Sequence, residues 1–445
     1  MHSKFSSRVA ANFTGIYLAF LALAVFLQQF LPSYLNYASI QSVSWKLNDG
    51  WCEPQSQGIG VHCFGDFYYP LTFANQINPW QGFNPYPPLS VLLFRPFSWI
   101  DQMPFSRLAL ILFIATLVIA LIFPVFHLKF VAKEISYQTF SILLLVTLLC
   151  APAIVTIDRG NNLLMLIPFL YLFFRNWLIE NNNKMFFYGL ICVGLRPQFI
   201  ILGVVIFQSL GLRKTIKWLS SIAALYLASF VLYPQSFPMN VAYWVYKLFT
   251  FPDYAARGVL MPVNISLSSD LDIVLIALGI NLSTSFIKAF IGITAALFIY
   301  FLAMGIRRRS KIHNLILLLF LPLLFTGTAF HYYLILLYIP FLFHFARLLD
   351  KQAKGSLLRL HEEEVQRPIL SRSLPSFSFL LFSIFAFIPW GIPWNVIFPS
   401  LKNLDWSGIG INWIVAQYSL VFFALVMIWP SNTDLLRRSR KEVRN

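Results

Sequence analysis

Apolar runs of about 20 residues recur along the whole chain, separated by polar or proline-containing segments. A run of this length allows one helix to cross the hydrocarbon core of a bilayer. One run, 185–211, is interrupted by Arg196-Pro197, and proline disfavours a helical conformation in the residue before it. We therefore expect two short helices there, which meet at a turn. The predicted crossings number about twelve: 12–31, 104–126, 136–154, 162–179, 185–195, 197–211, 214–233, 284–305, 312–327, 329–348, 375–397 and 409–430.

Two long segments between the runs predict helices that lie along the membrane surface. Residues 32–103 are rich in proline, glycine, asparagine and aromatic residues, and the apolar stretch 87–99 within them is too short for a span. We expect a re-entrant or interfacial helix at 87–99, and another interfacial helix near 270–280 in the second loop, 234–283. The predicted fold is all-α: a polytopic transmembrane helical bundle with two long outer loops that carry interfacial helices.

The chain divides into a membrane core and a C-terminal part, and a charged segment joins the two. We expect the core at 1–349, a basic cytoplasmic linker at 350–374, further transmembrane helices at 375–430 and a basic cytoplasmic tail at 431–445. No small-residue cleavage site follows the first apolar run, so we expect that run to remain as a span.

Composition and charge agree with a multi-pass membrane protein. Hydrophobic residues make up 58% of the chain and charged residues 11%, whereas soluble proteins carry about 25% charged residues. With the N-terminus in the cytoplasm, 24 of the 33 lysines and arginines fall in predicted cytoplasmic segments. Such a bias sets orientation, so the formal charge of +16 indicates topology and not a nucleic-acid partner. We expect both termini to be cytoplasmic and the protein to lie among the lipids of a bacterial plasma membrane.

Unusual polar residues gather on the predicted outer, extracytoplasmic side. Ionisable groups at the mouth of a membrane bundle are functional by default. Clusters from separate segments on one side therefore predict one cavity. The clusters are Asp66 among Phe67, Tyr68 and Tyr69; Asp158-Arg159-Gly160-Asn161-Asn162; Arg196-Pro197-Gln198; Asn264 with Ser266; and His331-Tyr332-Tyr333.

Two of these clusters contain the acids. Asp66 either is a solvated loop acid or acts as a general base, which must reach an acceptor hydroxyl. Asp158 and Arg159 either form an ion pair that caps the next helix, with Asn161 and Asn162 as N-cap residues, or bind an anion at that helix's N-terminus.

Two other clusters supply candidate ligands for a phosphate. Arg196 lies in the middle of an apolar run, where a charge is costly unless it faces a wet cavity or a partner. One interpretation is that the Arg196 side chain snorkels to the membrane interface. The other is that it binds a phosphate, because its planar guanidinium matches phosphate oxygens. His331 either anchors the aromatic belt or binds a phosphate or hydroxyl group.

The cysteines predict a possible disulfide but no metal site. Cys52 and Cys63 share the first outer loop and could form a disulfide if that compartment is oxidising. Cysteine and histidine spacings fit no zinc pattern, and no nucleotide-binding loop or dinucleotide fingerprint is present. We expect neither a metal nor a cofactor.

The order of the motifs resembles the family 87 glycosyltransferases of the GT-C class, which include polyprenol-phosphate-mannose-dependent α-mannosyltransferases. The resemblance covers the chain from the first span to about residue 345. Arg196-Pro197-Gln198 stands where relatives often have Lys-Pro-Gln, and Arg159-Gly160-Asn161-Asn162 where many have Gly-Gln-x-Asn. The motifs that carry it are Asp66-Phe67-Tyr68-Tyr69, Asn84-Pro85-Tyr86-Pro87-Pro88-Leu89, Arg159-Gly160-Asn161-Asn162-Leu163-Leu164, Arg196-Pro197-Gln198, Asn264-Ile265-Ser266-Leu267 and His331-Tyr332-Tyr333.

The resemblance implies an inverting enzyme that moves a sugar, mannose or a related one, from a polyprenyl-phosphate donor to a lipid or glycan acceptor. It implies that Asp66 is the general base and that Arg196, His331 and Arg159 bind the donor phosphate. The remaining implied substrate-binding residues are Tyr69, Asn84, Tyr86, Asp158, Asn161, Asn162, Gln198, Asn264 and Tyr332.

Two other functions fit a polytopic protein with a polar cavity. A transporter or flippase of lipid-linked sugars predicts access from both sides and pseudo-symmetric halves, yet no repeat or paired broken segment is evident in the sequence. An O-antigen-ligase-like enzyme also uses lipid-linked sugars on the outer face.

Overall fold

The structure is a computed structural model, and it is described between residues 64 and 343. All of its regular elements in that part are helical. The described residues are 64–81, 84–101, 106–131, 137–149, 151–233, 237–256, 282–305, 311–325, 331–340 and 342–343, with single residues at 135, 266, 267, 271, 275 and 280. The predicted spans 12–31, 375–397 and 409–430, the linker 350–374 and the tail 431–445 lie outside them.

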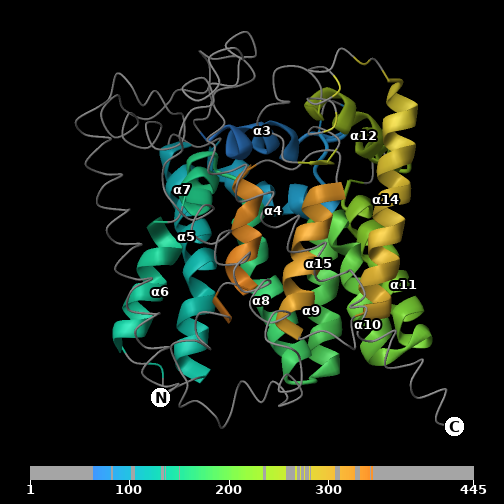
Figure 1. Ribbon diagram of the computed structural model, residues 1–445. Helices are drawn as coiled ribbons and strands as arrows, with labels where there is room; N and C mark the ends of the chain where they lie inside the picture. Colours follow the sequence, from blue (N-terminus) through green and yellow to red (C-terminus); the bar gives the residue numbers. More distant parts are fainter. Residues whose placement is uncertain are drawn as a thin grey trace, which may run out of the picture.

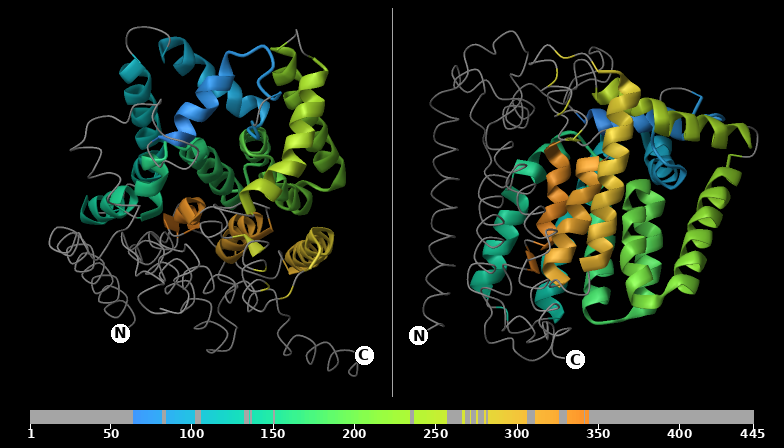
Figure 2. Two further views of the ribbon diagram at one scale, coloured as in Figure 1. Left: turned by 90° about the horizontal axis from the view of Figure 1, so that it is seen from above. Right: turned by 45° about the vertical axis from the view of Figure 1, so that its right-hand side comes forward.

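Long helices run roughly side by side and form the body of the molecule (Figure 1). Helices α3 (Gly65–Ala74) and α12 (Met239–Ala256) lie across one end of them, as the views in Figure 2 also show. The other elements are α4 (Pro88–Asp101), α5 (Ser106–Val131), α6 (Tyr137–Leu149), α7 (Ala151–Asp158), η1 (Asn162–Leu166), α8 (Ile167–Leu178), α9 (Asn182–Leu195), η2 (Pro197–Leu202), α10 (Gly203–Leu210), α11 (Leu212–Val231), α14 (Thr284–Gly305), α15 (Lys311–Phe325) and η5 (His331–Leu337).

The predicted break at Arg196-Pro197 is confirmed. Helix α9 ends at Leu195, Arg196 is extended with φ −147° and ψ 104°, and the chain resumes as η2 and α10. The extended conformation is the one that a following proline favours. The end of α9 is held from two sides, because Ser90 Oγ donates to Leu195 O at 2.7 Å and Tyr226 Oη donates to Val193 O at 2.5 Å.

The two long loops contain more helix than the sequence predicted. The helix expected at 87–99 is confirmed as α4, but α3 lies before it in the same loop and was not predicted. The second loop contains α12, also not predicted, whereas the helix expected near 270–280 falls largely outside the described residues. The α3 segment is short and contains Pro70, so its sequence lacks a helical signature.

Aromatic packing fixes α3 on the bundle. The ring of Phe67 is fully buried and lies 4.5 Å from the ring of Phe113 on α5, between centroids. Phe94 and Phe97 of α4 complete the cluster, each 6.3 Å from Phe67. Such ring pairs add to the free energy gained by burial. The first turn of α3, which carries Asp66, is thereby placed over the end of the bundle.

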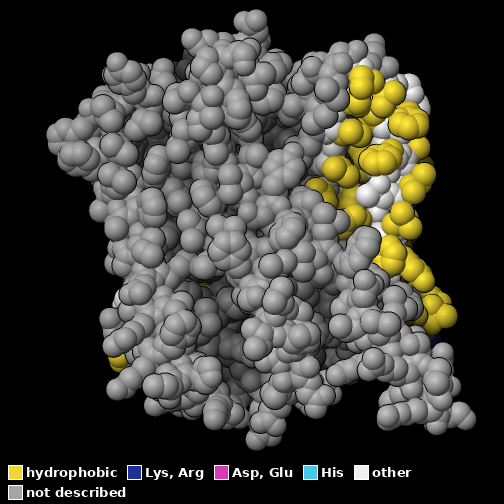
Figure 3. Space-filling model, in the orientation of Figure 1, with side chains coloured by type: hydrophobic (Ala, Val, Ile, Leu, Met, Phe, Trp, Pro, Cys, Tyr) yellow, Lys and Arg dark blue, Asp and Glu magenta, His cyan; other side chains and the backbone are white. Residues whose placement is uncertain are grey.

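Among the described residues, two helices are long and apolar enough to cross a membrane, at Leu108–Val131 and Ser285–Ala303. The second lies on α14, whose side chains form an exposed apolar surface that includes Phe286, Phe290 and Ile293 (Figure 3). Other predicted spans coincide with shorter helices, for example 162–179 with η1 and α8. The twelve-span arrangement therefore stays a prediction.

Candidate functional site

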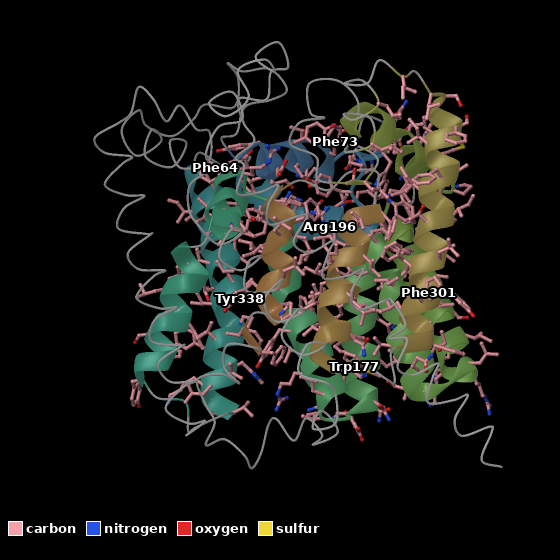
Figure 4. All side chains as sticks on the ribbon, in the orientation of Figure 1. Phe64, Phe73, Trp177, Arg196, Phe301 and Tyr338 are labelled. Carbon is pink, nitrogen blue, oxygen red and sulfur yellow. The ribbon has the colours of Figure 1, made fainter. Side chains whose placement is uncertain are left out.

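Separate segments of the chain meet at Asp66, and we call this group the Asp66 cluster. Asp66 lies in the first turn of α3, and Arg196 lies at the turn between α9 and η2. The site lies near the end of the bundle that α3 crosses, where Arg196 is labelled in Figure 4. The cluster consists of Asp66, Tyr86, Arg159, Asn161, Asn162, Arg196 and Tyr333.

Asp66 forms a two-pronged ion pair with Arg159. Arg159 Nε donates to Asp66 Oδ2 at 2.9 Å and Arg159 Nη2 donates to Asp66 Oδ1 at 3.0 Å. Asn161 Nδ2 also donates to Asp66 Oδ2 at 2.7 Å. The side chains of Arg159 and Asp66 are 24% and 16% exposed, so the ion pair is mostly buried but not fully enclosed. Fork geometry of this kind combines charge with directional hydrogen bonds.

The backbone places these two side chains together. Asp66 N donates to Arg159 O at 2.9 Å, which ties the start of α3 to the turn after α7. That turn requires Gly160, whose φ is +64° and whose missing Cβ would lie only 2.8 Å from Phe67 Cβ. Phe64, just before α3, has a left-handed φ of 50° although it is not glycine. Strained residues of this type cluster at functional sites.

Arg196 joins the two asparagines to η5. Its Nη2 donates to Asn162 Oδ1 at 2.7 Å and to Asn161 Oδ1 at 3.0 Å, and its Nη1 donates to Tyr333 Oη at 3.2 Å. Its guanidinium carbon lies 5.5 Å from the ring centroid of Tyr86, within cation–π range. The costly charge in the apolar run is therefore satisfied by a polar cluster.

Asn161 links the two halves of the cluster. Its Oδ1 accepts hydrogen bonds from Arg196 and from Leu163 N, the latter at 2.9 Å, so that it caps η1. The amide nitrogen is then left facing Asp66. The predicted N-cap role of Asn161 is confirmed.

The loop before α4 presents Tyr86 to Arg196. Asn84 is fully buried; its Oδ1 accepts from Tyr86 N at 3.1 Å and its Nδ2 donates to Pro79 O at 3.1 Å. Trp80 Nε1 donates to Tyr86 O at 2.8 Å. These hydrogen bonds of Asn84 shape the loop, and its substrate-binding role stays a prediction.

The cluster favours an ionised Asp66. Burial works against ionisation, but the Arg159 charge, the hydrogen bonds from Arg159 and Asn161 and the Arg196 charge outweigh it and lower the pKa of Asp66. Burial, with the negative charge of Asp66, raises the pKa of the Tyr86 phenol. Asp66 is thus a carboxylate and Tyr86 a neutral phenol at neutral pH.

Not every predicted site residue joins the cluster. Tyr69 packs its ring on Phe73 at 5.0 Å between centroids, and Gln198 is half-buried at the start of η2. Ser266 is fully buried. His331 and Tyr332 open η5, but their side chains and that of Asp158 lie outside the described part, as do Asn264, Cys52 and Cys63.

Tyr333 is the site residue that sequence reasoning did not select. The predicted residue of the Tyr332-Tyr333 pair was Tyr332, yet the hydroxyl of Tyr333 contacts Arg196. Both tyrosines fit the same motif, and the sequence does not indicate that the hydroxyl of Tyr333 lies at Arg196.

Comparisons with known proteins assign no family. No family model matches the chain, and no curated protein matches it. The resemblance to family 87 glycosyltransferases therefore rests on the motifs alone.

Proposed function

We propose that the protein is an inverting glycosyltransferase that moves mannose or a related sugar from a polyprenyl-phosphate donor to a lipid or glycan acceptor. The observation that carries the proposal is the Asp66 cluster, in which one partly exposed carboxylate lies beside two arginines drawn from separate segments. This reaction requires two kinds of group: a general base for the acceptor hydroxyl and ligands that bind the donor phosphate.

The reaction needs no acid on the donor side, because a polyprenyl phosphate is a good leaving group. The acceptor oxygen attacks the anomeric carbon opposite the phosphate, and the bond from that carbon to the phosphate oxygen breaks. The acceptor proton passes to Asp66, and the electron pair leaves with the phosphate. Carboxylates serve as the base in other inverting sugar-transfer reactions.

Arg196 is the candidate ligand of the leaving phosphate. Its guanidinium is oriented by Asn161, Asn162 and Tyr333 before any substrate arrives. Donors that are fixed in advance stabilise developing charge without reorganisation in the transition state. A planar fork also matches two phosphate oxygens at once.

The ion pair with Arg159 weakens Asp66 as a base, because base strength falls as the pKa falls. A donor phosphate that approaches Arg159 competes with the carboxylate for the guanidinium. Loss of that contact raises the pKa of Asp66 toward its ordinary range. Donor binding thereby activates the base only when a sugar is ready for transfer.

The setting we propose is a twelve-span membrane protein with cytoplasmic termini and the Asp66 cluster on the extracytoplasmic side. Support comes from the two helices that are long enough to span and from the apolar surface of α14. The excess of lysine and arginine in the predicted cytoplasmic segments supports the proposed orientation of the protein in the membrane.

The test is sugar transfer from a defined polyprenyl-phosphate donor in detergent, with donor affinity measured in parallel. Asp66→Asn keeps the size and one of the two hydrogen-bond acceptors toward Arg159 but cannot take the proton. We expect its transfer rate to fall by roughly 10²–10⁴-fold, with donor still bound. Asp101→Asn, the same change at the last residue of α4, is the matched control and should leave the rate unchanged. Turnover of Asp66→Asn within a few-fold of wild type contradicts the assignment of the base.

A further inference from the structure

A second polar group lies between α4 and the end of α11, outside the Asp66 cluster. The guanidinium carbon of Arg95, on α4, is 5.1 Å from the ring centroid of Tyr233, just past α11. The hydroxyl of Tyr233 donates to Ala74 O at 3.1 Å and thus ties the end of α3 to the same place. Arg95, the end of α3 and the end of α11 therefore meet around one tyrosine.

Three polar atoms on α4 and on the segment that follows α3 are buried and lack a hydrogen-bond partner in the described part of the chain. They are Nε of Arg95, Oδ1 of Asn75 and Oδ1 of Asn78. Asn75 directly follows Ala74, and Asn78 lies two residues before Trp80, whose ring is 5.3 Å from that of Tyr233. Most buried polar atoms in proteins are hydrogen-bonded, so unpaired ones call for a water, an ion or a ligand.

The donors and acceptors define the chemistry of such a ligand. No carboxylate lies within ion-pair distance of Arg95 among the described residues, so its charge has no protein counter-ion there. An arginine with an open donor suits a phosphate oxygen. The amide oxygens of Asn75 and Asn78 accept hydrogen bonds, which hydroxyl groups supply.

We propose that Arg95, Asn75 and Asn78 form a binding site for a phosphate ester that also carries hydroxyl groups, with the Tyr233 ring as its floor. Such a ligand is the headgroup of a phospholipid or a free polyol phosphate. Phosphate binds Arg95, and the hydroxyl groups bind the two asparagines.

The spacing connects this site to the Asp66 cluster. Helix α4 begins at Pro88, directly after the Tyr86 segment, and Arg95 is seven residues further on, about 10 Å at the helical rise. Trp80 contacts both places, because its Nε1 donates to Tyr86 O and its ring packs on Tyr233. One molecule can therefore place its phosphate at Arg95 and a sugar hydroxyl near Asp66. That assignment to the acceptor rests on the proposed function, whereas the phosphate site itself does not.

The experiment measures binding to the full chain in dodecyl maltoside, a detergent without phosphate, and with no sugar donor present. The probes are glycerol 3-phosphate and dioctanoyl phosphatidylglycerol, with glycerol and dioctanoylglycerol as phosphate-free controls. We expect the wild type to bind one or both phosphate esters and neither control. Arg95→Gln should weaken this binding by at least about tenfold, as expected for one lost charge-assisted hydrogen bond. Lys288→Gln on α14, which removes an exposed lysine, should leave it unchanged.

Each outcome of this binding experiment either supports or overturns the proposed phosphate site. Binding of the soluble ester identifies the headgroup as sufficient, and binding of the lipid alone identifies a lipid ligand; both support the site. Equal binding by Arg95→Gln and wild type overturns it, as does failure of the wild type to bind either ester. Binding lost in Arg196→Gln but kept in Arg95→Gln overturns this site and leaves the proposed function standing. If Arg95→Gln does not fold, Arg95→Lys keeps the charge without Nε and should also bind more weakly.

Discussion

Gly160 offers the sharpest test that the turn after α7 positions Asp66. Gly160→Ala adds one methyl group at a residue whose φ is +64°. A side chain in a left-handed conformation costs roughly 1–2 kcal/mol. The new Cβ would also lie 2.8 Å from Phe67 Cβ and 3.4 Å from both Phe64 Cα and Phe67 N. None of these atoms is the far end of a flexible side chain, so α3 itself must move.

The size of the movement follows from ordinary contact distances. Carbon atoms pack at about 3.5–4.0 Å, so α3 must withdraw by about 1 Å. The hydrogen bond from Asp66 N to Arg159 O, now 2.9 Å, would then exceed normal hydrogen-bond length. Overpacking of this kind costs about 1–3 kcal/mol, and with the backbone strain we expect a loss of about 2–5 kcal/mol in the free energy of unfolding.

The assay separates stability from function. Thermal unfolding of the detergent-solubilised protein measures the first, and the rate of sugar transfer per folded molecule measures the second. A misplacement of about 1 Å at a reacting group can lower a rate by about 10²-fold. We therefore expect Gly160→Ala to lose transfer even at temperatures where it is folded.

Gly211→Ala is the matched control. Gly211 also has a positive φ, +79°, but an added Cβ there meets nothing within 4 Å. It should lose stability through backbone strain and keep the transfer rate per folded molecule. If Gly160→Ala transfers sugar like wild type and is no less stable than Gly211→Ala, the turn does not position Asp66 and the reasoning fails.

Three further predictions follow from the site and the fold. Arg196→Lys keeps the charge but loses the fork that reaches Asn162 and Tyr333, so donor affinity should fall by about tenfold in a direct binding assay; unchanged affinity would exclude Arg196 as the phosphate ligand. Because the pKa of Asp66 is lowered in the folded protein, the stability that its ion pair contributes is present above the ordinary pKa of about 3.9 and is lost as pH falls through the lowered value. The midpoint of thermal unfolding of the wild type should therefore drop more steeply below about pH 4 than that of Asp66→Asn. If the two midpoints depend on pH in the same way, the ion pair of Asp66 does not contribute this stability. Single-cysteine labelling of intact cells should reach positions beside Asp66 and Arg196 and not positions in the 350–374 linker, and labelling of the linker from outside would refute the topology.

The sequence by itself determined where most of the helices lie and which residues are chemically unusual. Apolar run length located the helices from α5 to α11, and Pro197 located the break that exposes Arg196. The cost of a charge in an apolar run singled out Arg196, and the aromatic surroundings singled out Asp66. These are local properties, because helix formation and desolvation depend on neighbours in the chain.

Only the tertiary structure decided how these residues pair. The ion pair joins Asp66 to Arg159, 93 residues apart, and it depends on Phe67 packing against α4 and α5 and on the missing Cβ of Gly160. The contact between the hydroxyl of Tyr333 and Arg196 depends on how η5 packs against the turn after α9. Helices α3 and α12 form on the end of the bundle, and neither contains an apolar run long enough to have revealed it. Contacts between distant segments follow from packing, and no local pattern specifies that packing.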